Sequence, residues 1–275
     1  MKQVGHLSLK AIEWMLLLAV SLVFVFPFLW MALTAFKTLP EVFQFPPTWL
    51  PESLQFQNFL IAWSSGPFFI YLLNSTLVAV GILLLQILTA VPAAYAFARY
   101  RFRGRNLLFG VTLIALMIPP QVIFLPIYVE MSNWGLVNTL WSLILPYGAS
   151  AFGIFLLRQA FMQVPDEVIE AARLDNASEW KIMWTIMAPM AKHVLVTFGL
   201  FSFIYHWNDY FWPLIMTNSN EVRTLPIGIS MLKAADGGSQ WNVVMAGNMI
   251  LVFPILLIFF FAQRHIISAF VYQSK

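Results

Sequence analysis

Long apolar stretches separated by shorter polar ones account for most of this 275-residue chain. The first covers about residues 14–36 without a charged side chain, and it exceeds the ~20 residues that a helix needs to cross the hydrocarbon core of a bilayer. Further stretches follow at about residues 68–98, 107–129, 136–157, 194–216 and 242–262. The pattern predicts an all-α integral membrane protein with six transmembrane helices.

Prolines indicate where these helices bend or stop, because proline lacks a backbone N–H and clashes with the preceding turn. Pro27 lies inside the first stretch and predicts a kink or a local break, whereas Pro119 and Pro120 predict a broken third helix. The first stretch is also too long for the core of a signal peptide, so we interpret it as a retained span.

Two polar segments, residues 37–67 and 217–240, separate the spans on one side of the membrane. Each has at most about thirty residues, which is too few for an independent hydrophobic core. We therefore expect a single transmembrane domain over residues 1–275, with its core at about 68–265.

The positions of lysine and arginine predict the orientation of the chain. Six spans put both termini on one side, and twelve of the fifteen cations fall on that side. They are Lys2, Lys10, Arg99, Arg101, Arg103, Arg105, Arg158, Arg173, Lys181, Lys192, Arg264 and Lys275. Since positive charge accumulates in cytoplasmic loops, we expect both termini in the cytoplasm.

Composition narrows the possible functions. The chain is 60% hydrophobic and 10% charged, whereas soluble domains carry roughly 25% charged residues. Cysteine is absent, which excludes disulfides and thiolate chemistry, and neither a phosphate-binding glycine loop nor an HExxH metal motif occurs. The four histidines are scattered, and we interpret them as interfacial polar residues. We expect a protein that is not an enzyme, binds no cofactor and takes its energy from another chain.

The longest charged segment, residues 165–189, lies between the fourth and fifth predicted spans. Pro165 suits the first position of a helix, and acids follow it at the positive end of the helix dipole. Glu170 and Arg173 are three residues apart and are expected to pair on one helix face. Ala171 and Ala172 leave a patch without bulk that another protein could approach closely.

A turn is predicted after this helix, at Asp175 and Asn176. Asparagine adopts the left-handed backbone conformation more readily than most non-glycine residues. Ser178 is placed to cap a second short helix with an apolar side. The segment thus predicts two short helices that present a charged corner to an aqueous compartment.

The corner resembles the signature of permease subunits of ATP-binding-cassette (ABC) importers. That signature is Glu-Ala-Ala, three residues, Gly, nine residues, Ile, one residue and Leu-Pro. The matching residues here are Glu170, Ala171, Ala172, Asn176, Ile186, Ala188 and Pro189. Asn176 replaces the usual glycine and Ala188 the usual leucine, and the spacing is otherwise kept.

The resemblance extends over about residues 26–271. Over this range the chain is similar to the second permease of carbohydrate importers of the maltose and glycerol-phosphate types. It rests on Asn74-Ser75, AAYAFARYRFRGR at 93–105, LPY at 145–147, WNDYFWPL at 207–214 and Gln263-Arg264. It implies the type I ABC importer permease fold in a bacterial cytoplasmic (inner) membrane. The chain would be a multi-pass protein there.

The resemblance also implies partners and a docking site. A second, homologous permease would share the bilayer, two copies of an ATPase subunit would hold ATP and Mg, and an extracytoplasmic solute-binding protein would deliver the solute. No nucleic-acid partner is implied. Residues 164–192 would form the coupling loop that engages the ATPase, and the alternative is an ordinary cytoplasmic loop. Its docking residues would be Glu170, Ala171, Ala172, Arg173, Asp175 and Asn176.

Polar residues inside predicted spans are candidates for the substrate path, since such groups are costly in lipid. The clearest group lies in the outer half of the fifth span and consists of Tyr205, His206, Trp207, Asn208, Asp209 and Tyr210. Aromatic faces beside amide and carboxylate groups suit sugar hydroxyls, but the same residues also fit an interfacial aromatic belt. Weaker candidates are Asn74, Ser75, Gln86 and Gln121, for which packing or an interhelical hydrogen bond is an equal explanation.

The absence of lysine and arginine from the predicted span cores favours a neutral sugar or oligosaccharide over glycerol 3-phosphate or a related polyol phosphate. A secondary transporter is a lower alternative, because it predicts ion-coupling carboxylates and internal repeats. Asp209 is the one candidate acid, and we find no convincing repeat. A membrane-embedded enzyme would need a catalytic constellation inside the spans, and none is apparent.

Overall fold

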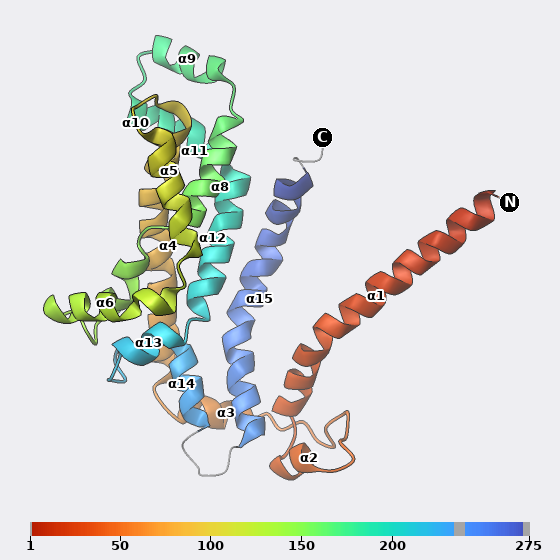
Figure 1. Cartoon of the computed structure of the whole chain (residues 1–275). Coiled ribbons are helices and arrows are strands. Elements are labelled where there is room, and N and C mark those ends of the chain that lie inside the picture. The colour runs from red at the N-terminus through yellow and green to blue at the C-terminus, as the bar shows by residue number, and fades with distance from the viewer. Residues whose placement is uncertain (1, 234–239, 272–275) are drawn as a thin grey trace. The chain divides into compact units, whose positions relative to one another are not determined.

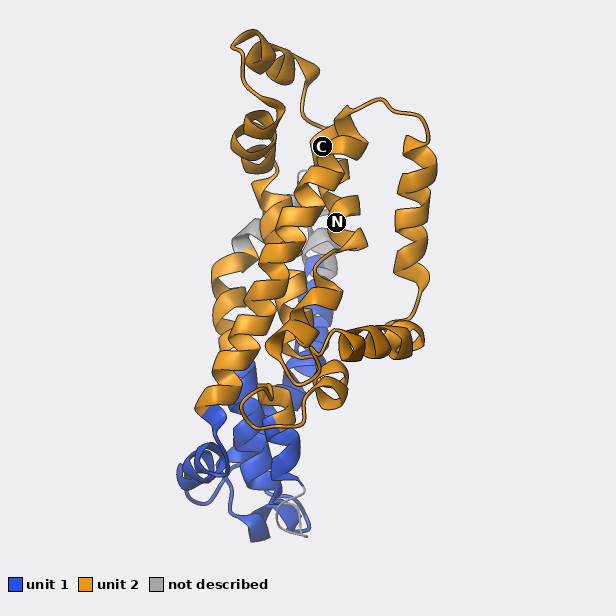
Figure 2. Ribbon diagram, turned by 90° about the vertical axis from the view of Figure 1, so that its left-hand side faces the viewer, with its two compact units in different colours: residues 1–68, 228–253 blue, residues 69–227, 254–275 orange. Residues whose placement is uncertain are grey.

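The computed structural model describes residues 2–233 and 240–271, and within them every regular element is a helix. Two compact units divide the chain, residues 1–68 with 228–253 and residues 69–227 with 254–275 (Figure 2). Lys275 and part of the predicted outer loop, residues 234–239, lie outside the described residues.

Three helices are long and apolar enough to cross a membrane unbroken. They are α1 (Lys2–Ala35, apolar from Ile12), α4 (Phe68–Arg99) and α15 (Trp241–Val271, apolar to Gln263). Each begins or ends within a few residues of a predicted span. Pro27 does not end α1, although the sequence predicted a kink or break there.

Three bent helix pairs account for the other predicted spans, which brings the number of candidate spans to as many as six. The first pair is α5 (Arg105–Ile114) with η1 (Ala115–Met117), followed by α6 (Pro120–Asn133) at 99°. The second is α7 (Leu140–Ile144) with η2 (Leu145–Tyr147), followed by α8 (Ala151–Met162) at 43°. The third joins α10 (Glu179–Lys181), η3 (Ile182–Met187) and α11 (Ala188–Met190) to α12 (Lys192–Trp207) at 81°.

The described residues also form shorter helices. They are α2 (Leu39–Phe43), α3 (Gln57–Ser64), α9 (Asp166–Leu174), α13 (Phe211–Met216) and α14 (Leu225–Leu232). The fifth predicted span is therefore divided, because α12 ends at Trp207 and α13 begins at Phe211.

The break between α5 and α6 confirms the prediction from the two prolines. Ile118 and Pro119 are extended, with ψ of 116° and 132°, because a residue that precedes proline is driven out of the helical conformation. The chain then restarts as α6 at Pro120, whose missing N–H is harmless in a first turn. As a result α6 runs across the direction of α5 (Figure 1).

The second unit has a core in which α4 packs against α8 and the segment that follows it. Ala90, Val91 and Ala94 of α4 are fully buried beside Leu157 and Phe161 of α8. Small residues on α4 allow the neighbouring helices to approach closely, as is usual between membrane helices. This core supports the charged corner, because Ile169 of α9 and Ile182 of η3 belong to it.

Arg158 lies within α8, which continues beyond the predicted end of the fourth span. Its Nε donates to the carbonyl of Phe97 at 3.2 Å, and its guanidinium lies 4.1 Å from the ring centroid of Phe109. The carbonyl of Phe97 and the face of the Phe109 ring therefore satisfy this cation.

The first unit buries a cation that the sequence placed in a polar loop. Lys37 is 2% exposed, its ammonium lies 4.8 Å from the centroid of the Trp30 ring, and it donates to the carbonyl of Thr48. Asn58 joins the same region, because its Nδ2 donates to the carbonyls of Ala35 and Lys37 at 2.8 and 2.9 Å. Asn242 in turn donates to Oδ1 of Asn58 at 3.0 Å.

Candidate functional site

The helix α9 forms the charged corner predicted from the sequence, and it lies beyond the ends of α5 and α8 (Figure 1). It begins at Asp166, so Pro165 precedes the first helical residue instead of occupying that position, because its ψ of 142° is extended. Its exposed residues include Glu167, Glu170, Ala171 and Leu174, which share one face at helical spacing. Leu174 is 83% exposed, so this face combines two acids with an uncovered apolar side chain.

The two alanines of the motif face opposite ways. Ala172 is 9% exposed and packs with Ile169 into the core, whereas Ala171 belongs to the exposed face. The predicted patch without bulk is therefore reduced to Ala171. Ala172 instead allows α9 to lie close to the helices beneath it.

The turn after α9 has the left-handed residue that the sequence predicted. Asn176 has φ of 56°, its N–H donates to the carbonyl of Arg173 at 3.0 Å, and the N–H of Ala177 donates to the carbonyl of Ala172 at 3.0 Å. These two bonds define a Schellman motif, which ends a helix with one left-handed residue. Ser178 then caps α10 by accepting from the N–H of Lys181 at 3.3 Å, as predicted.

Substitutions at Asn176 should separate a need for the left-handed conformation from a need for the amide. Asn176→Gly is expected to keep the turn, since glycine adopts positive φ freely. Asn176→Val is expected to cost about 1–2 kcal/mol of local stability, because a β-branched residue is strained there. Thermal unfolding of the purified protein measures the effect. Unchanged thermal stability of the valine variant would show that the turn has no such need.

Arg173 pairs with Glu179, whereas the sequence predicted a pair with Glu170. Its Nε donates to Oε1 of Glu179 at 2.8 Å. The Schellman turn brings the start of α10 back beside the end of α9, while Glu170 lies on the exposed face. A pair across a turn cannot be read from helical spacing, so the expected Glu170–Arg173 pair was wrong.

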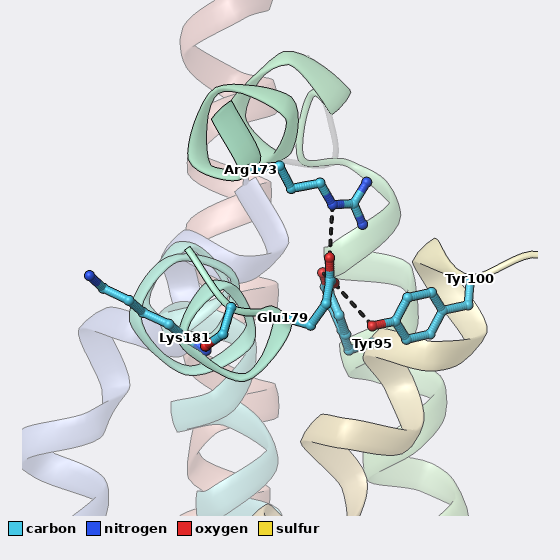
Figure 3. A network of polar contacts seen from close by, with 6 residues as sticks. Tyr95, Tyr100, Arg173, Glu179 and Lys181 are labelled. Atoms are coloured by element: carbon cyan, nitrogen blue, oxygen red, sulfur yellow. Dashed lines mark hydrogen bonds and ion pairs between the residues drawn. The ribbon is translucent and has the colours of Figure 1, made fainter. Parts of the chain in front are cut away.

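Two tyrosines at the end of α4 join this pair (Figure 3). Oε2 of Glu179 accepts from the hydroxyl of Tyr95 at 2.7 Å and from that of Tyr100 at 3.0 Å. Burial raises the pKa of Tyr100, and the hydrogen bond to Glu179 raises it further, so this hydroxyl remains a donor at neutral pH.

A cavity of about 750 Å³ lies within the second unit. Its walls come from α4, the α5–α6 break, the η2–α8 junction, α12 and α13, and most of its lining side chains are apolar. The polar or hydrogen-bonding side chains among the lining residues are Gln86, Tyr147, Ser150, Ser202, Tyr205, His206 and Trp212.

Gln86 is the centre of the polar wall of this cavity. Its Nε2 donates to the carbonyl of Tyr147 at 2.9 Å, and its Oε1 accepts from Oγ of Ser202 at 2.6 Å. The Nε2 atoms of Gln86 and His206 lie 3.4 Å apart, and the His206 and Tyr147 rings are 4.7 Å apart. From the sequence, Gln86 was predicted only as a weaker candidate for the substrate path, although a glutamine in the middle of a membrane span itself indicates a functional site.

The residues predicted for the substrate path do not form one cluster. Tyr205 lines the cavity, whereas Trp207 is 2% exposed and stacks on Phe203 with ring centroids 5.3 Å apart. Side chains two positions apart on an α-helix point in different directions, which explains why Trp207 does not line the cavity beside Tyr205. Asn208 donates to the carbonyl of Ile204 at 2.8 Å beyond the end of α12.

The last two of these residues lie between α12 and α13. Oδ1 of Asp209 accepts from the N–H of Trp212 at 3.3 Å and so satisfies the start of α13, and Tyr210 is exposed. The acid therefore has a helix terminus as its partner, a favourable place for a carboxylate.

The weaker candidates in α4 have structural partners. Nδ2 of Asn74 donates to the carbonyls of Glu221 and Arg223 at 2.8 and 2.9 Å, and Oγ of Ser75 accepts from the N–H of Leu225 at 2.8 Å. These bonds hold the loop before α14. Gln121 is exposed at the start of α6.

The described residues thus form a helical membrane protein with a charged helix outside its long spans and a cavity among its bent ones. Residues 86–271 match the family described as the binding-protein-dependent transport system inner membrane component. The chain belongs to this family, and it is the permease subunit of an ABC importer whose transport depends on a binding protein.

Named relatives agree with this assignment. The sn-glycerol-3-phosphate transport system permease protein of Yersinia pestis is 36% identical over 242 residues, which cover 86% of each chain. The arabinooligosaccharides transport system permease protein of Halalkalibacterium halodurans is 32% identical over 263 residues, 94% of each chain. The crystal structure of a bacterial ABC transporter involved in the import of the acidic polysaccharide alginate matches 94% of this chain and 96% of that one, with a TM-score of 0.82 and 22% identity.

These findings confirm the predicted family, the helical permease fold and the inner-membrane location. A secondary transporter and a membrane-embedded enzyme are set aside, since the family works with a binding protein and its membrane component is a permease.

Proposed function

We propose that this chain is one of two homologous permeases of an ABC importer for a neutral sugar or oligosaccharide, driven by two ATPase subunits of which one docks on α9. The observation that carries the proposal is the geometry of α9 and its turn. The Glu-Ala-Ala motif presents Glu170 and Ala171 on an exposed face, and the motif position usually held by glycine is occupied by a left-handed residue. The family match supplies the context in which such a corner docks.

The proposed orientation places both termini, and α9, in the cytoplasm. Its support is the excess of lysine and arginine on that side of the predicted spans. ATP and Mg would be bound by the ATPase subunits, and this chain would bind neither. Glu170 would contact the ATPase, while Arg173, Asp175 and Asn176 would fix the corner that presents it.

The solute path is proposed to include the cavity beside Gln86. Tyr147, Tyr205 and the ring of His206 supply aromatic faces there, and aromatic faces with a few hydroxyl and amide groups suit the apolar faces and hydroxyls of a sugar. No lysine or arginine is found among the described residues that line the cavity, which favours a neutral solute. Glycerol 3-phosphate is the second candidate, because a relative at 36% identity is named for its transport.

Reconstitution tests this proposal directly. The purified chain alone is expected to move no solute, whereas the chain with the second permease, the ATPase and the binding protein is expected to import solute only with ATP. Uptake of radiolabelled maltooligosaccharides, arabinooligosaccharides and glycerol 3-phosphate into vesicles measures both the requirement and the solute class. Failure of the ATPase to co-purify with the two permeases would contradict the proposal, as would transport by the chain alone down an ion gradient.

A further inference from the structure

The carboxylate of Glu179 joins two helices that belong to different parts of the second unit. On one side it accepts from Arg173, at the end of α9, at 2.8 Å. On the other side it accepts from Tyr95 and Tyr100, at the end of α4, at 2.7 and 3.0 Å. Figure 3 shows the guanidinium and the phenol groups converging on this one side chain.

A second connection ties the beginning of α9 to the same helix. Arg99, in the last turn of α4, donates to Oδ1 of Asp166 and to the carbonyls of Phe161 and Val164. The guanidinium side chain is 10% exposed, so this connection is shielded from water on the arginine side. Both ends of α9 are thus bound to the cytoplasmic end of α4.

The two connections differ from ordinary surface ion pairs. The Arg173 and Glu179 side chains are 46% and 41% exposed, and such a pair alone contributes little. Tyr95, however, is 3% exposed and packs in the core beside Phe161, with ring centroids 6.4 Å apart. Since its hydroxyl is held by a packed ring, the carboxylate that it binds is held in one place too.

The helix α4 leads from these connections to the cavity. Gln86 lies nine residues from Tyr95 along α4, or about 13 Å at the rise of an α-helix. Gln86 also holds the carbonyl of Tyr147 and the hydroxyl of Ser202 at the cavity wall. Tyr95 and Gln86 thus lie on one helix, which stays unbroken through Pro92 and connects the end of α4 with that wall.

We propose that Glu179 is a positioning residue that locks α9 to α4, so that a displacement of α9 by its docked partner is passed through α4 to the Gln86 wall of the cavity. The inference rests on the proposed function, because it requires a partner that displaces α9. It adds a residue at a position that the signature leaves unspecified, and it names the helix that carries the movement.

Removal of the two tyrosine hydroxyls tests the link with little change of packing or charge. In the Tyr95→Phe, Tyr100→Phe double variant the Arg173–Glu179 pair and the Arg99–Asp166 connection remain, and only the bonds between Glu179 and the end of α4 are lost. Solute imported per ATP hydrolysed by the reconstituted complex is expected to fall about tenfold, in line with the loss of hydrogen bonds to a charged group. Glu179→Gln is expected to lower the same ratio.

A matched control comes from the other end of the same helix. Tyr71 is 2% exposed in α4 and donates to Oδ1 of Asn220 at 3.0 Å, so Tyr71→Phe removes a comparable hydrogen bond far from α9. Its transport per ATP is expected to equal that of the unmodified complex.

Several results would overturn the inference. One is an unchanged ratio in the double tyrosine variant, even if Glu179→Gln lowers it, because the link to α4 would then be unused. Another is a loss of complex yield and thermal stability with the ratio retained, which indicates a purely structural role. In both cases the ATPase still co-purifies with the unmodified chain, and the proposed function stands. Absence of the ATPase from the unmodified complex would contradict both the inference and the proposed function.

Discussion

Replacement of Gly153 by alanine is expected to lower the free energy of unfolding by about 1–3 kcal/mol, the usual cost of forcing an extra carbon into a packed interior. Gly153 lies in α8 where it meets α12. A Cβ at this position would lie 2.6 Å from Cζ and 2.7 Å from Cε2 of Phe198. Phe198 is 1% exposed, and its ring has to shift from its packed position before a Cβ can fit. Thermal unfolding of the purified protein, followed by tryptophan fluorescence, measures the loss.

Gly110 provides a matched control in α5. A Cβ there would meet nothing within 4 Å, so Gly110→Ala is expected to gain the ~0.5–1 kcal/mol by which alanine is preferred over glycine in a helix. Exchange of Phe198 for leucine in the Gly153→Ala background is expected to restore part of the lost stability, because the clash is with the ring. Equal melting temperatures for Gly153→Ala and Gly110→Ala would contradict the close α8–α12 contact.

Features that depend on local chemistry were predicted well from the sequence. The lengths of the apolar stretches located α1, α4 and α15, and the Pro119-Pro120 pair located the break before α6. The turn at Asn176 and its left-handed conformation were predicted because few other residues adopt positive φ at low cost. In each case a residue constrains the backbone of its immediate neighbours, whatever the rest of the chain does.

Features that depend on distant parts of the chain were missed. Tyr95 and Glu179 are separated by 84 positions, and nothing in the periodicity of either segment indicates their hydrogen bond. The same holds for Lys37, which is buried against Trp30 because the loop folds back and offers the carbonyl of Thr48. A polar side chain shows in the sequence only that it needs a partner, and tertiary packing decides which partner it finds.

The candidate substrate path shows the same limit. Sequence reasoning grouped Tyr205 with Trp207 because they are near in the chain, but the helix turns the second away from the cavity. Gln86 and Ser202 come from different helices and meet at 2.6 Å. A site built between helices has to be found by which faces meet, and that requires the packing of α4 against α12.

The largest functional effect is expected from Glu170→Lys. Glu170 is exposed on the face of α9 that is proposed to meet the ATPase, so the change should leave folding and membrane insertion intact. Loss of one partner of an interfacial charge pair costs about 2 kcal/mol or more, which corresponds to at least about thirtyfold weaker association. ATP-driven uptake by vesicles, together with the amount of ATPase that co-purifies with the tagged permease, measures this expectation.

Glu130→Lys gives the same change of charge at an exposed glutamate on α6, away from α9, and is expected to retain both uptake and ATPase binding. Glu170→Gln removes the charge without reversing it, so its uptake should lie between those of the unmodified protein and Glu170→Lys. This order follows if the carboxylate faces a cation of the partner, because repulsion is then added to a lost attraction. Unchanged uptake and ATPase binding in Glu170→Lys would show that α9 does not dock through this face.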